Sequence, residues 1–341
     1  MSRTPRKGIL AGGNWILDRT KIIDVYPAQD ALANILAETS CNGGAPYNVL
    51  IDLARLEAPF PLAGVGLVGD DEAGHYILQD CHSHGIDTRQ LRVTTKAPTS
   101  YDDVMTVKST GRRTFFFQRG ANRFLDAEHF DFEQSNARIF HLGYLLLLDR
   151  LDLPHPTYGT VAAAVLERAQ KAGLETSVDL VSEDSDRFPS IVRPALRFCD
   201  YCLLNEFEAE RTTGIKITCN GEIDRGAALK AAHELLAAGV RQWVVIHFPV
   251  AAIAVDSSGQ ELLQTSLNVP QEKIAGTVGA GDAFAAGVLL GLHEGVSMQV
   301  ALTYGVCAAA ASLTDPTTSN GVKPLRECLQ LAEEFGYRRL T

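Results

Sequence analysis

Several features that mark particular classes of protein are missing from this sequence. It has no apolar run long enough to span a bilayer, and no N-terminal apolar segment followed by a small-residue cleavage site. It also has no GxxxxGK[ST] phosphate loop and no GxSxG nucleophile elbow. We therefore expect neither a membrane nor a secreted protein, and neither a P-loop NTPase nor a GxSxG hydrolase.

Positive charge is also scarce. The chain has 31 lysine and arginine residues against 41 acidic ones, a formal net charge of −10, and its only basic cluster is a short one at residues 3–7. This balance argues against binding to nucleic acid or to an anionic membrane surface. The seven cysteines are odd in number and scattered, which fits a reducing, cytoplasmic setting better than a disulfide framework.

Two groups of cysteine and histidine have spacings seen in metal or redox sites. Cys199 and Cys202 have CxxC spacing, but their segment reads as a strand, in which residues three apart point to opposite faces. Residues 81–84, Cys-His-Ser-His, end a predicted helix and lack a second ligand pair. A structural role is favoured for both groups.

The chain does contain enough apolar residues for one large core, because 46% of its 341 residues are hydrophobic. Short apolar runs alternate with amphipathic segments, a pattern typical of βαβ units and a mainly parallel sheet covered on both faces. We therefore predict one Rossmann-like, three-layer α/β domain over residues 1–341. The predicted strands are residues 9–11, 62–68, 201–204 and 243–246, and the predicted helices are 48–56, 74–84, 160–172, 225–238, 283–292 and 300–313.

A different pattern interrupts this alternation. Residues 99–118 alternate β-type side chains around Thr110-Gly111, where a hairpin turn is expected, and residues 17–25 form a second such stretch. Together they predict a small β-sheet lid formed by about residues 16–30 and 97–122. A lid of this kind commonly excludes water during a transfer reaction.

Residues 64–69 read GVGLVG and match the GxGxxG pattern of dinucleotide-binding folds, with Asp87 near the usual acidic position. The glycines fall inside the predicted strand rather than after it, so a packing role is favoured over a cofactor role. A dinucleotide-binding oxidoreductase is therefore the weaker alternative.

The segment 276–292, GTVGAGDAFAAGVLLGL, places small residues and one acid at the start of an apolar helix. Gly279, Ala280 and Gly281 let a ligand approach the backbone, and a helix start offers unpaired N–H groups to an anion. Asp282 follows directly. A carboxylate beside an anion site suggests that a negative group arrives where a proton must be removed.

Two further stretches lie where ligands usually bind. Residues 42–48, NGGAPYN, form a glycine-rich helix entry flanked by amides. Asn205-Glu206-Phe207-Glu208 follows a strand and begins a helix, so its carboxylates could hold a hydrated Mg²⁺. Plain helix capping by Asn205, with first-turn acids on the dipole, is the alternative for this second stretch.

In this order, the pieces resemble the ribokinase-like (PfkB) carbohydrate kinase family over nearly the whole chain. The most specific element is GTVGAGDAFAAG from residue 276. The other similar elements are NGGAPYNVLIDLARL from residue 42, LAGVGLVGDDEAGHYILQDCHSHGIDT from residue 62, GAN at 120–122, FHLGYLL at 140–146 and NEFEAERTTG from residue 205.

The resemblance implies transfer of the ATP γ-phosphoryl group to a sugar hydroxyl, with ATP and Mg²⁺ as cofactors and a possible homodimer through the lid. It implies Asp282 as the catalytic base, ionised at neutral pH, and the backbone from Gly279 to Gly281 as the anion hole. The remaining implied roles are Mg²⁺ organisation, largely through water, by Asn205 and Glu208; nucleotide binding by Asn205, Thr277, Gly279 and Gly281; and binding of the sugar hydroxyls by Asp18, Gly43, Gly44 and Asn48.

The chain departs from the family pattern at two places. The family usually has an aspartate at the position of Gly276, where the acid helps to bind a monovalent cation, so K⁺ activation is in doubt. The family also tends to have a Thr-x-Gly-x-x-Gly element near the nucleotide phosphates, where this chain has HFPVAA at residues 247–252. For His247 a structural role is favoured over a catalytic one.

We therefore predict an ATP-dependent sugar kinase. A nucleoside kinase of the same family and a non-catalytic sugar- or nucleotide-binding relative are the main alternatives. The retention of Asp282 with its glycines favours an enzyme over a binding protein.

Overall fold

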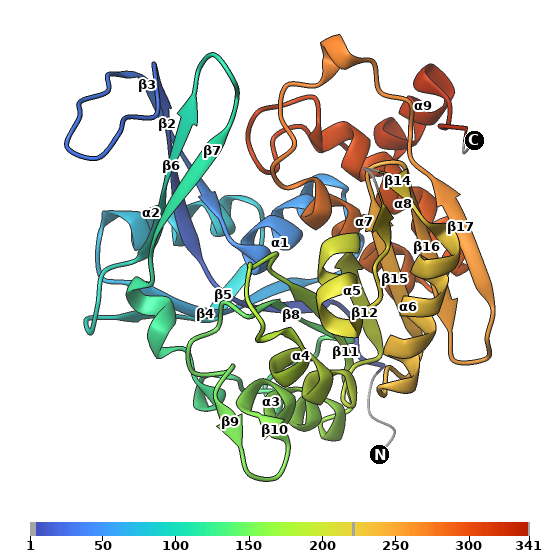
Figure 1. Cartoon of the computed structure of the whole chain (residues 1–341). Coiled ribbons are helices and arrows are strands. Elements are labelled where there is room, and N and C mark those ends of the chain that lie inside the picture. Colours follow the sequence, from blue (N-terminus) through green and yellow to red (C-terminus); the bar gives the residue numbers. More distant parts are fainter. Residues whose placement is uncertain (1–4, 220–221, 340–341) are drawn as a thin grey trace.

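The computed structural model describes residues 5–219 and 222–339. It shows a three-layer α/β body with a smaller sheet that projects from one end (Figure 1). No helix in these residues is long and apolar enough to cross a membrane.

The middle layer is a mainly parallel sheet, as predicted. In the described part of the chain its nine strands lie in the order β17-β16-β15-β12-β11-β8-β1-β4-β5. Strand β16 is antiparallel to both of its neighbours, β15 and β17, and all the other pairs of neighbours are parallel. In sheet order the strands are β17 (Glu261–Thr265), β16 (Ala251–Asp256), β15 (Trp243–Phe248), β12 (Tyr201–Asn205), β11 (Glu175–Leu180), β8 (Ile139–Leu145), β1 (Ile9–Gly13), β4 (Leu62–Gly69) and β5 (Asp87–Thr94).

Helices cover both faces of this sheet, so each face has its own apolar core. One core packs α1, α2, α7, α8 and α9 against the sheet, and the other packs α3, α4, α5 and α6. The six predicted helices are confirmed, with ends that differ by a few residues. The helices are α1 (Ala45–Arg55), α2 (Glu72–Ser83), α3 (Val161–Lys171), α4 (Phe188–Leu196), α5 (Glu206–Thr213), α6 (Arg225–Ala237), α7 (Ala280–Glu294), α8 (Met298–Ser312) and α9 (Leu325–Phe335).

The GxGxxG stretch lies within β4, and its glycines make room for a tryptophan. A Cβ on Gly64 would lie 2.7 Å from the ring of Trp15, and a Cβ on Gly66 would lie 2.3 Å from it. Trp15 is fully buried and donates its indole N–H to the carbonyl oxygen of Val65 at 3.0 Å. The glycines thus serve packing, as the sequence pattern favoured.

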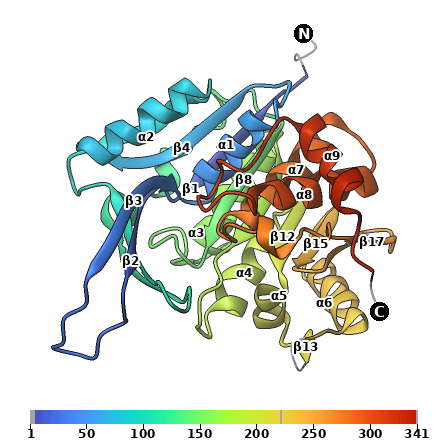
Figure 2. The same cartoon turned by 90° about the horizontal axis from the view of Figure 1, so that it is seen from above.

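The lid is a four-stranded sheet in the described residues, in the order β3-β2-β6-β7. Its strands are β2 (Ile16–Ile23), β3 (Ile35–Gly43), β6 (Ser100–Val107) and β7 (Arg113–Gln118). The β6–β7 hairpin turns at Gly111, which has a φ of 67°, as the sequence predicted. Strand β3 was not predicted, because most of this edge strand is exposed and it lacks a buried alternation. Figure 2 shows the β2–β3 hairpin reaching away from the body.

Asn122, in the predicted GAN element, joins the two roots of the lid. Its Oδ1 accepts from the backbone N–H of Trp15 at 3.2 Å, and its Nδ2 donates to the carbonyl oxygen of the same residue at 3.0 Å. Trp15 lies just before β2, and Asn122 follows β7 in a short 3₁₀ helix, η1 (Gly120–Phe124). Both lid segments therefore leave the body at one point.

The remaining elements are short connections. They are η2 (Ala127–His129), η3 (Gln271–Lys273), β9 (Pro154–His155), β10 (Gly159–Thr160), β13 (Thr218–Cys219) and β14 (Glu222–Ile223). Cys199 precedes β12 rather than lying within a strand, and both it and Cys202 are fully buried. Residues 81–84 lie at the C-terminal end of α2, as predicted.

Candidate active site

Helix α7 begins at a position that only glycine fills well. Gly279, the N-cap residue, has a φ of 79°, and a Cβ there would lie 2.2 Å from the carbonyl oxygen of Thr318. No side chain caps the helix, and the first N–H groups of an α-helix have no acceptor within it. The backbone of Ala280 and Gly281 therefore offers donors and the positive end of the dipole to an anion.

Asp282 sits in the first turn of this helix and is 5% exposed. The hydroxyl of Tyr144 donates to both of its carboxylate oxygens, at 2.8 and 2.9 Å, and Nδ2 of Asn48 donates to its Oδ2 at 2.8 Å. Burial raises the pKa of Asp282 to about 6, and the hydrogen bonds from Asn48 and Tyr144 oppose this rise. The carboxylate is therefore still mostly ionised at pH 7, but more basic than an exposed aspartate.

Asp282 lies in a cavity of about 570 Å³ between the lid and the body, here called the acid-lined cavity. Most of the residues predicted to bind sugar or metal, or to take part in catalysis, meet there. The predicted residues that line it are Asp18, Gly44, Asn48, Asn205, Glu208, Gly279, Gly281 and Asp282. Gly43 lies behind Asp18, and a Cβ on it would lie 2.2 Å from Oδ2 of that aspartate.

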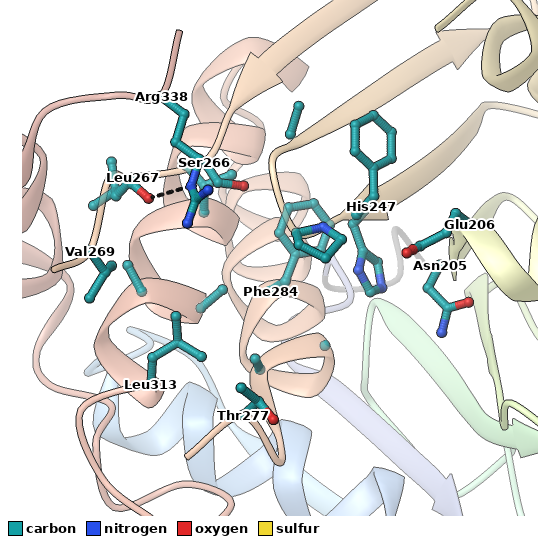
Figure 3. Close-up of a pocket in the computed structure, with 18 of the residues that line it drawn as sticks. Asn205, Glu206, His247, Ser266, Leu267, Val269, Thr277, Phe284, Leu313 and Arg338 are labelled. Carbon is teal, nitrogen blue, oxygen red and sulfur yellow. Dashed lines mark hydrogen bonds between the residues drawn. The ribbon is translucent and has the colours of Figure 1, made fainter. Parts of the chain in front are cut away.

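A second cavity of about 440 Å³, here called the apolar cavity, lies on the other side of the α7 start (Figure 3). Thr277, Ala280 and Gly281 line one end of it. The rest of its wall is largely apolar, with Val269, Phe284, Val306, Ala309, Ala310 and Leu313. Arg338 borders the cavity in Figure 3 and donates from Nε to the carbonyl oxygen of Leu267 at 3.4 Å. An apolar slot that ends at an anion site suits a base joined to phosphates.

Asn205 and Glu208 form a complete capping box at the start of α5. Oδ1 of Asn205 accepts from the N–H of Glu208, and Oε2 of Glu208 accepts from the N–H of Asn205, both at 2.9 Å. Oε1 of Glu208 also accepts from Ser182 and from Nδ2 of Asn205. Burial raises the pKa of Glu208 to about 7, against the lowering effect of these hydrogen bonds. Asn205 and Glu208 therefore cap the helix, and both side chains also line the acid-lined cavity.

His247 lies at the junction of the two cavities. It lines both of them, and its Cε1 lies 3.4 Å from where a Cβ on Gly281 would be. Its ring packs against Phe284, with centroids 5.0 Å apart, and has no hydrogen-bond partner among the described residues. Burial lowers the pKa of His247 to about 4, so the ring is neutral at pH 7. The altered loop becomes a tight turn at Pro249-Val250 between β15 and β16.

Gly276 lies against the loop that follows α8. A Cβ there would lie 3.0 Å from Cα of Pro316 and 3.2 Å from the carbonyl oxygen of Asp315. The position is therefore flanked by carbonyl oxygens of this loop rather than by a carboxylate of its own. No group of three or more His, Cys, Asp or Glu residues with metal-binding geometry occurs in residues 5–219 and 222–339.

Sequence reasoning missed three residues on the wall of the acid-lined cavity. Tyr144 ends β8, Asp179 is on β11, and Asp102 is on lid strand β6. Tyr144 lies within the FHLGYLL element, but nothing in that element names its partner. Asp102 belongs to a run that simply reads as a strand, and no element was predicted around Asp179, which lies on β11.

The family model for the pfkB family carbohydrate kinases matches residues 16–325. The chain therefore belongs to the PfkB family of carbohydrate kinases. It is a sugar kinase of this type, a phosphotransferase with the ribokinase fold.

Individual relatives agree with this assignment. The chain is 26% identical to a ribokinase of Haemophilus influenzae over 85% of this chain and 87% of that protein, and 28% identical to a fructokinase of Klebsiella pneumoniae over 82% and 84%. Among solved structures, ribokinase of Arabidopsis thaliana complexed with ribose and ATP matches with a TM-score of 0.78, at 21% identity over 96% of this chain and 98% of that one. A putative ribokinase II of E. coli in complex with ATP and Mg²⁺ matches with a TM-score of 0.75, at 19% identity over 97% and 100%.

Proposed function

We propose that this kinase transfers the γ-phosphoryl group of ATP to a hydroxyl of a sugar bound in the acid-lined cavity. The observation that carries the proposal is the position of Asp282. It is a buried carboxylate on the acid-lined cavity, in the first turn of an uncapped helix, directly after Gly281, which lines both cavities.

Asp282 acts as the base toward the attacking hydroxyl. Its raised pKa brings it closer to neutral pH, where a general base is most effective, while Tyr144 and Asn48 fix its orientation. The backbone N–H groups from Gly279 to Gly281 stabilise charge on the transferred group. The lid holds the sugar through Asp18 and keeps water from the phosphoryl group.

The nucleotide occupies the apolar cavity, with its phosphates toward Thr277 and Gly281. Asn205 and Glu208 would hold Mg²⁺ through water, because both Glu208 oxygens already accept hydrogen bonds within the protein. When bound, the ion supplies positive charge that offsets the negative charge of the phosphate chain.

A nucleoside as the acceptor is the second candidate, and one observation favours it. Phe115 and Phe117 of lid strand β7 line the acid-lined cavity, and aromatic rings offer a surface on which a base can stack. A purely binding role is disfavoured, because a relative without chemistry has no need to hold Asp282 with two oriented donors.

Release of ADP from ATP and Mg²⁺ with a panel of sugars and nucleosides tests the proposal. At least one sugar is expected to stimulate ADP release, with Asp282→Asn as the matched inactive control. Stimulation by nucleosides alone would instead support the second candidate, a nucleoside as the acceptor. No stimulation by any acceptor would favour the binding role.

The lid also supports a proposed homodimer. Its outer hairpin exposes several large apolar side chains, and strand β3 is an unpaired edge. The exposed residues are Val25, Tyr26, Leu32, Ile35 and Leu36. Light scattering is expected to give a dimer for the wild type and a monomer for Leu32→Ser/Ile35→Ser. A monomeric wild type would contradict this.

A further inference from the structure

Lid strands β2 and β6 bring two aspartates side by side over the acid-lined cavity. Asp18 and Asp102 are register partners in this parallel pair, so their side chains leave the same face of the lid sheet. Both line the cavity. The resemblance to sugar kinases gives Asp18 a role in sugar binding and gives Asp102 none.

No cation compensates this pair. Arg119 is the only lysine or arginine among the described residues that line the cavity. It is 39% exposed, it forms an ion pair with Asp149 at 3.4 Å, and it donates to the carbonyl oxygen of Leu147 at 3.2 Å. Lys21 is on the same strand as Asp18, but it pairs with Asp103, the neighbour of Asp102 on the opposite face of the sheet. Among the described residues, the charged side chains that the lid strands themselves bring to the cavity are therefore all acidic.

The cavity wall also has more free hydrogen-bond acceptors than free side-chain donors. The side-chain donors are already engaged: Asn48 and Tyr144 donate to Asp282, and Ser182 and Asn205 donate toward Glu208. The exceptions among the described residues are His247, on the wall shared with the apolar cavity, and the remaining N–H groups of Arg119.

Acceptors, in contrast, are left over. Oδ1 of Asp102 is buried without a partner, and so is Oδ1 of Asn48, a side chain that is only 3% exposed. The Asp18 carboxylate receives no hydrogen bond from the described residues. Buried acceptors of this kind require donors from the ligand.

A ligand that satisfies this wall brings donors and positive charge. A protonated amine supplies three N–H donors and a full charge, whereas a hydroxyl supplies one donor and no charge. Burial and the mutual repulsion of the pair already raise the pKa of Asp18 to about 7, and mainly burial raises that of Asp102 to about 6. A carboxylate or phosphate on the ligand would add a further negative charge, and among the described residues the only lysine or arginine on this wall is Arg119, which is already paired with Asp149.

We propose that Asp18 and Asp102 form an acceptor subsite that selects a sugar bearing a protonated amino group and excludes sugars bearing a carboxylate or a phosphate. This inference rests on the proposed function, since it names the class of sugar that the kinase takes. Asp102 is the specificity-determining residue of the pair.

The test compares sugars that share a skeleton and differ in charge. D-glucosamine, D-galactosamine and D-mannosamine are assayed at pH 7 with ATP and Mg²⁺, beside their neutral parents, their N-acetyl derivatives and the uronic acids. N-acetylation keeps the position of the nitrogen and removes its charge. For at least one skeleton, kcat/KM for the amino sugar is expected to exceed that for both uncharged forms by about tenfold or more, as expected for one charge-assisted hydrogen bond.

Variants then locate the preference. Asp102→Asn is expected to bring the ratio of amino to neutral sugar close to one, while Asp103→Asn, with the same charge change on the outer face of β6, keeps the wild-type ratio. Calorimetric binding of the amino sugar without nucleotide gives a second readout that needs no turnover, and Asp102→Ser replaces Asp102→Asn if the latter does not fold.

The outcomes separate the two proposals. One outcome is that the enzyme phosphorylates a neutral sugar, that this activity depends on Asp282, and that the ratio of amino to neutral sugar does not change in Asp102→Asn. This outcome overturns the subsite and leaves the proposed function intact. Equal use of uronic acids also overturns it. Amino-sugar binding that depends on Asp102, without any phosphorylation, supports the subsite and overturns the kinase mechanism. No binding of any amino sugar overturns the subsite.

Discussion

The Tyr144 hydroxyl contacts both carboxylate oxygens of Asp282, at 2.8 and 2.9 Å, from a strand 138 residues earlier in the chain. This donor lowers the pKa of Asp282, against the larger effect of burial. In Tyr144→Phe the opposing effect is lost, so the pKa rises and more of the base is protonated at a given pH. We expect the acid limb of the pH–rate profile to move to higher pH, with a larger loss of kcat at pH 6 than at pH 8. An unchanged midpoint would contradict this coupling.

Asp282 itself is expected to be indispensable for turnover. Asp282→Asn keeps the size of the side chain but cannot accept the proton, so kcat is expected to fall by about 10² or more, while sugar binding survives. In the wild type the rate is expected to decline as the pH falls through about 6, because the base becomes protonated. Near-normal turnover of the variant with the true acceptor would rule out the role.

Glu208→Gln tests the proposed metal site. The amide retains an oxygen for the N–H of Asn205, so the capping box is partly kept while the charge is removed. We expect a higher Mg²⁺ concentration for half-maximal rate, with little change in the KM for sugar. Glu210→Gln, on the same helix but outside both cavities, is the charge-matched control. If the Mg²⁺ titrations of the two variants coincide, Glu208 is a helix cap only.

Gly276 leads us to expect little stimulation by K⁺. The oxygens closest to a Cβ at this position are the carbonyl oxygens of Asp315 and Pro316, which carry no full charge, and cation affinity follows ligand charge and fit. Initial rates with K⁺ and with a non-binding organic cation are compared at equal ionic strength, because salt alone screens the nucleotide. The companion variant is Gly276→Asp, with its thermal stability checked, because a Cβ there is close to Pro316. Strong K⁺ activation of the wild type would refute the expectation.

His247 is expected to act on the nucleotide. It lies beside Gly281 at the junction of the cavities, and neither of its ring nitrogens has a protein partner in the described residues. His247→Thr, which restores the residue type usual in the family, is expected to change the KM for ATP more than the KM for sugar. A change in thermal stability with both KM values intact would instead assign the ring to packing against Phe284.

The sequence was informative where chemistry depends on local pattern. The alternation of apolar runs predicted the parallel sheet and its helices. The glycines before Asp282 predicted a helix start with unpaired N–H groups, and α7 begins there with no side-chain cap. These features depend on neighbours within one turn or one strand. The same holds for the hairpin at Gly111.

The sequence was silent where chemistry depends on partners far along the chain. The sequence predicts that Asn48 binds sugar, but it does not show that Nδ2 of this residue donates to Asp282. The alternation of β6 shows that Asp102 belongs to a strand but not that Asp18 lies beside it, because register between separate segments is set by tertiary packing. Strand β3 was not predicted for a related reason, since an exposed edge strand needs no alternation of apolar and polar residues.

The attachment of the lid has a mechanical consequence. Strands β2 and β6 pair along their whole length. Asn122 hydrogen-bonds to Trp15, just before β2, and donates its backbone N–H to Oγ of Ser100 at the start of β6. We therefore expect the lid to move as one unit. Another connection runs from β3 through Gly44 directly into α1, the helix that carries Asn48. Because Asn48 donates to Asp282, we expect a movement of the lid over a sugar to be coupled to the orientation of the base.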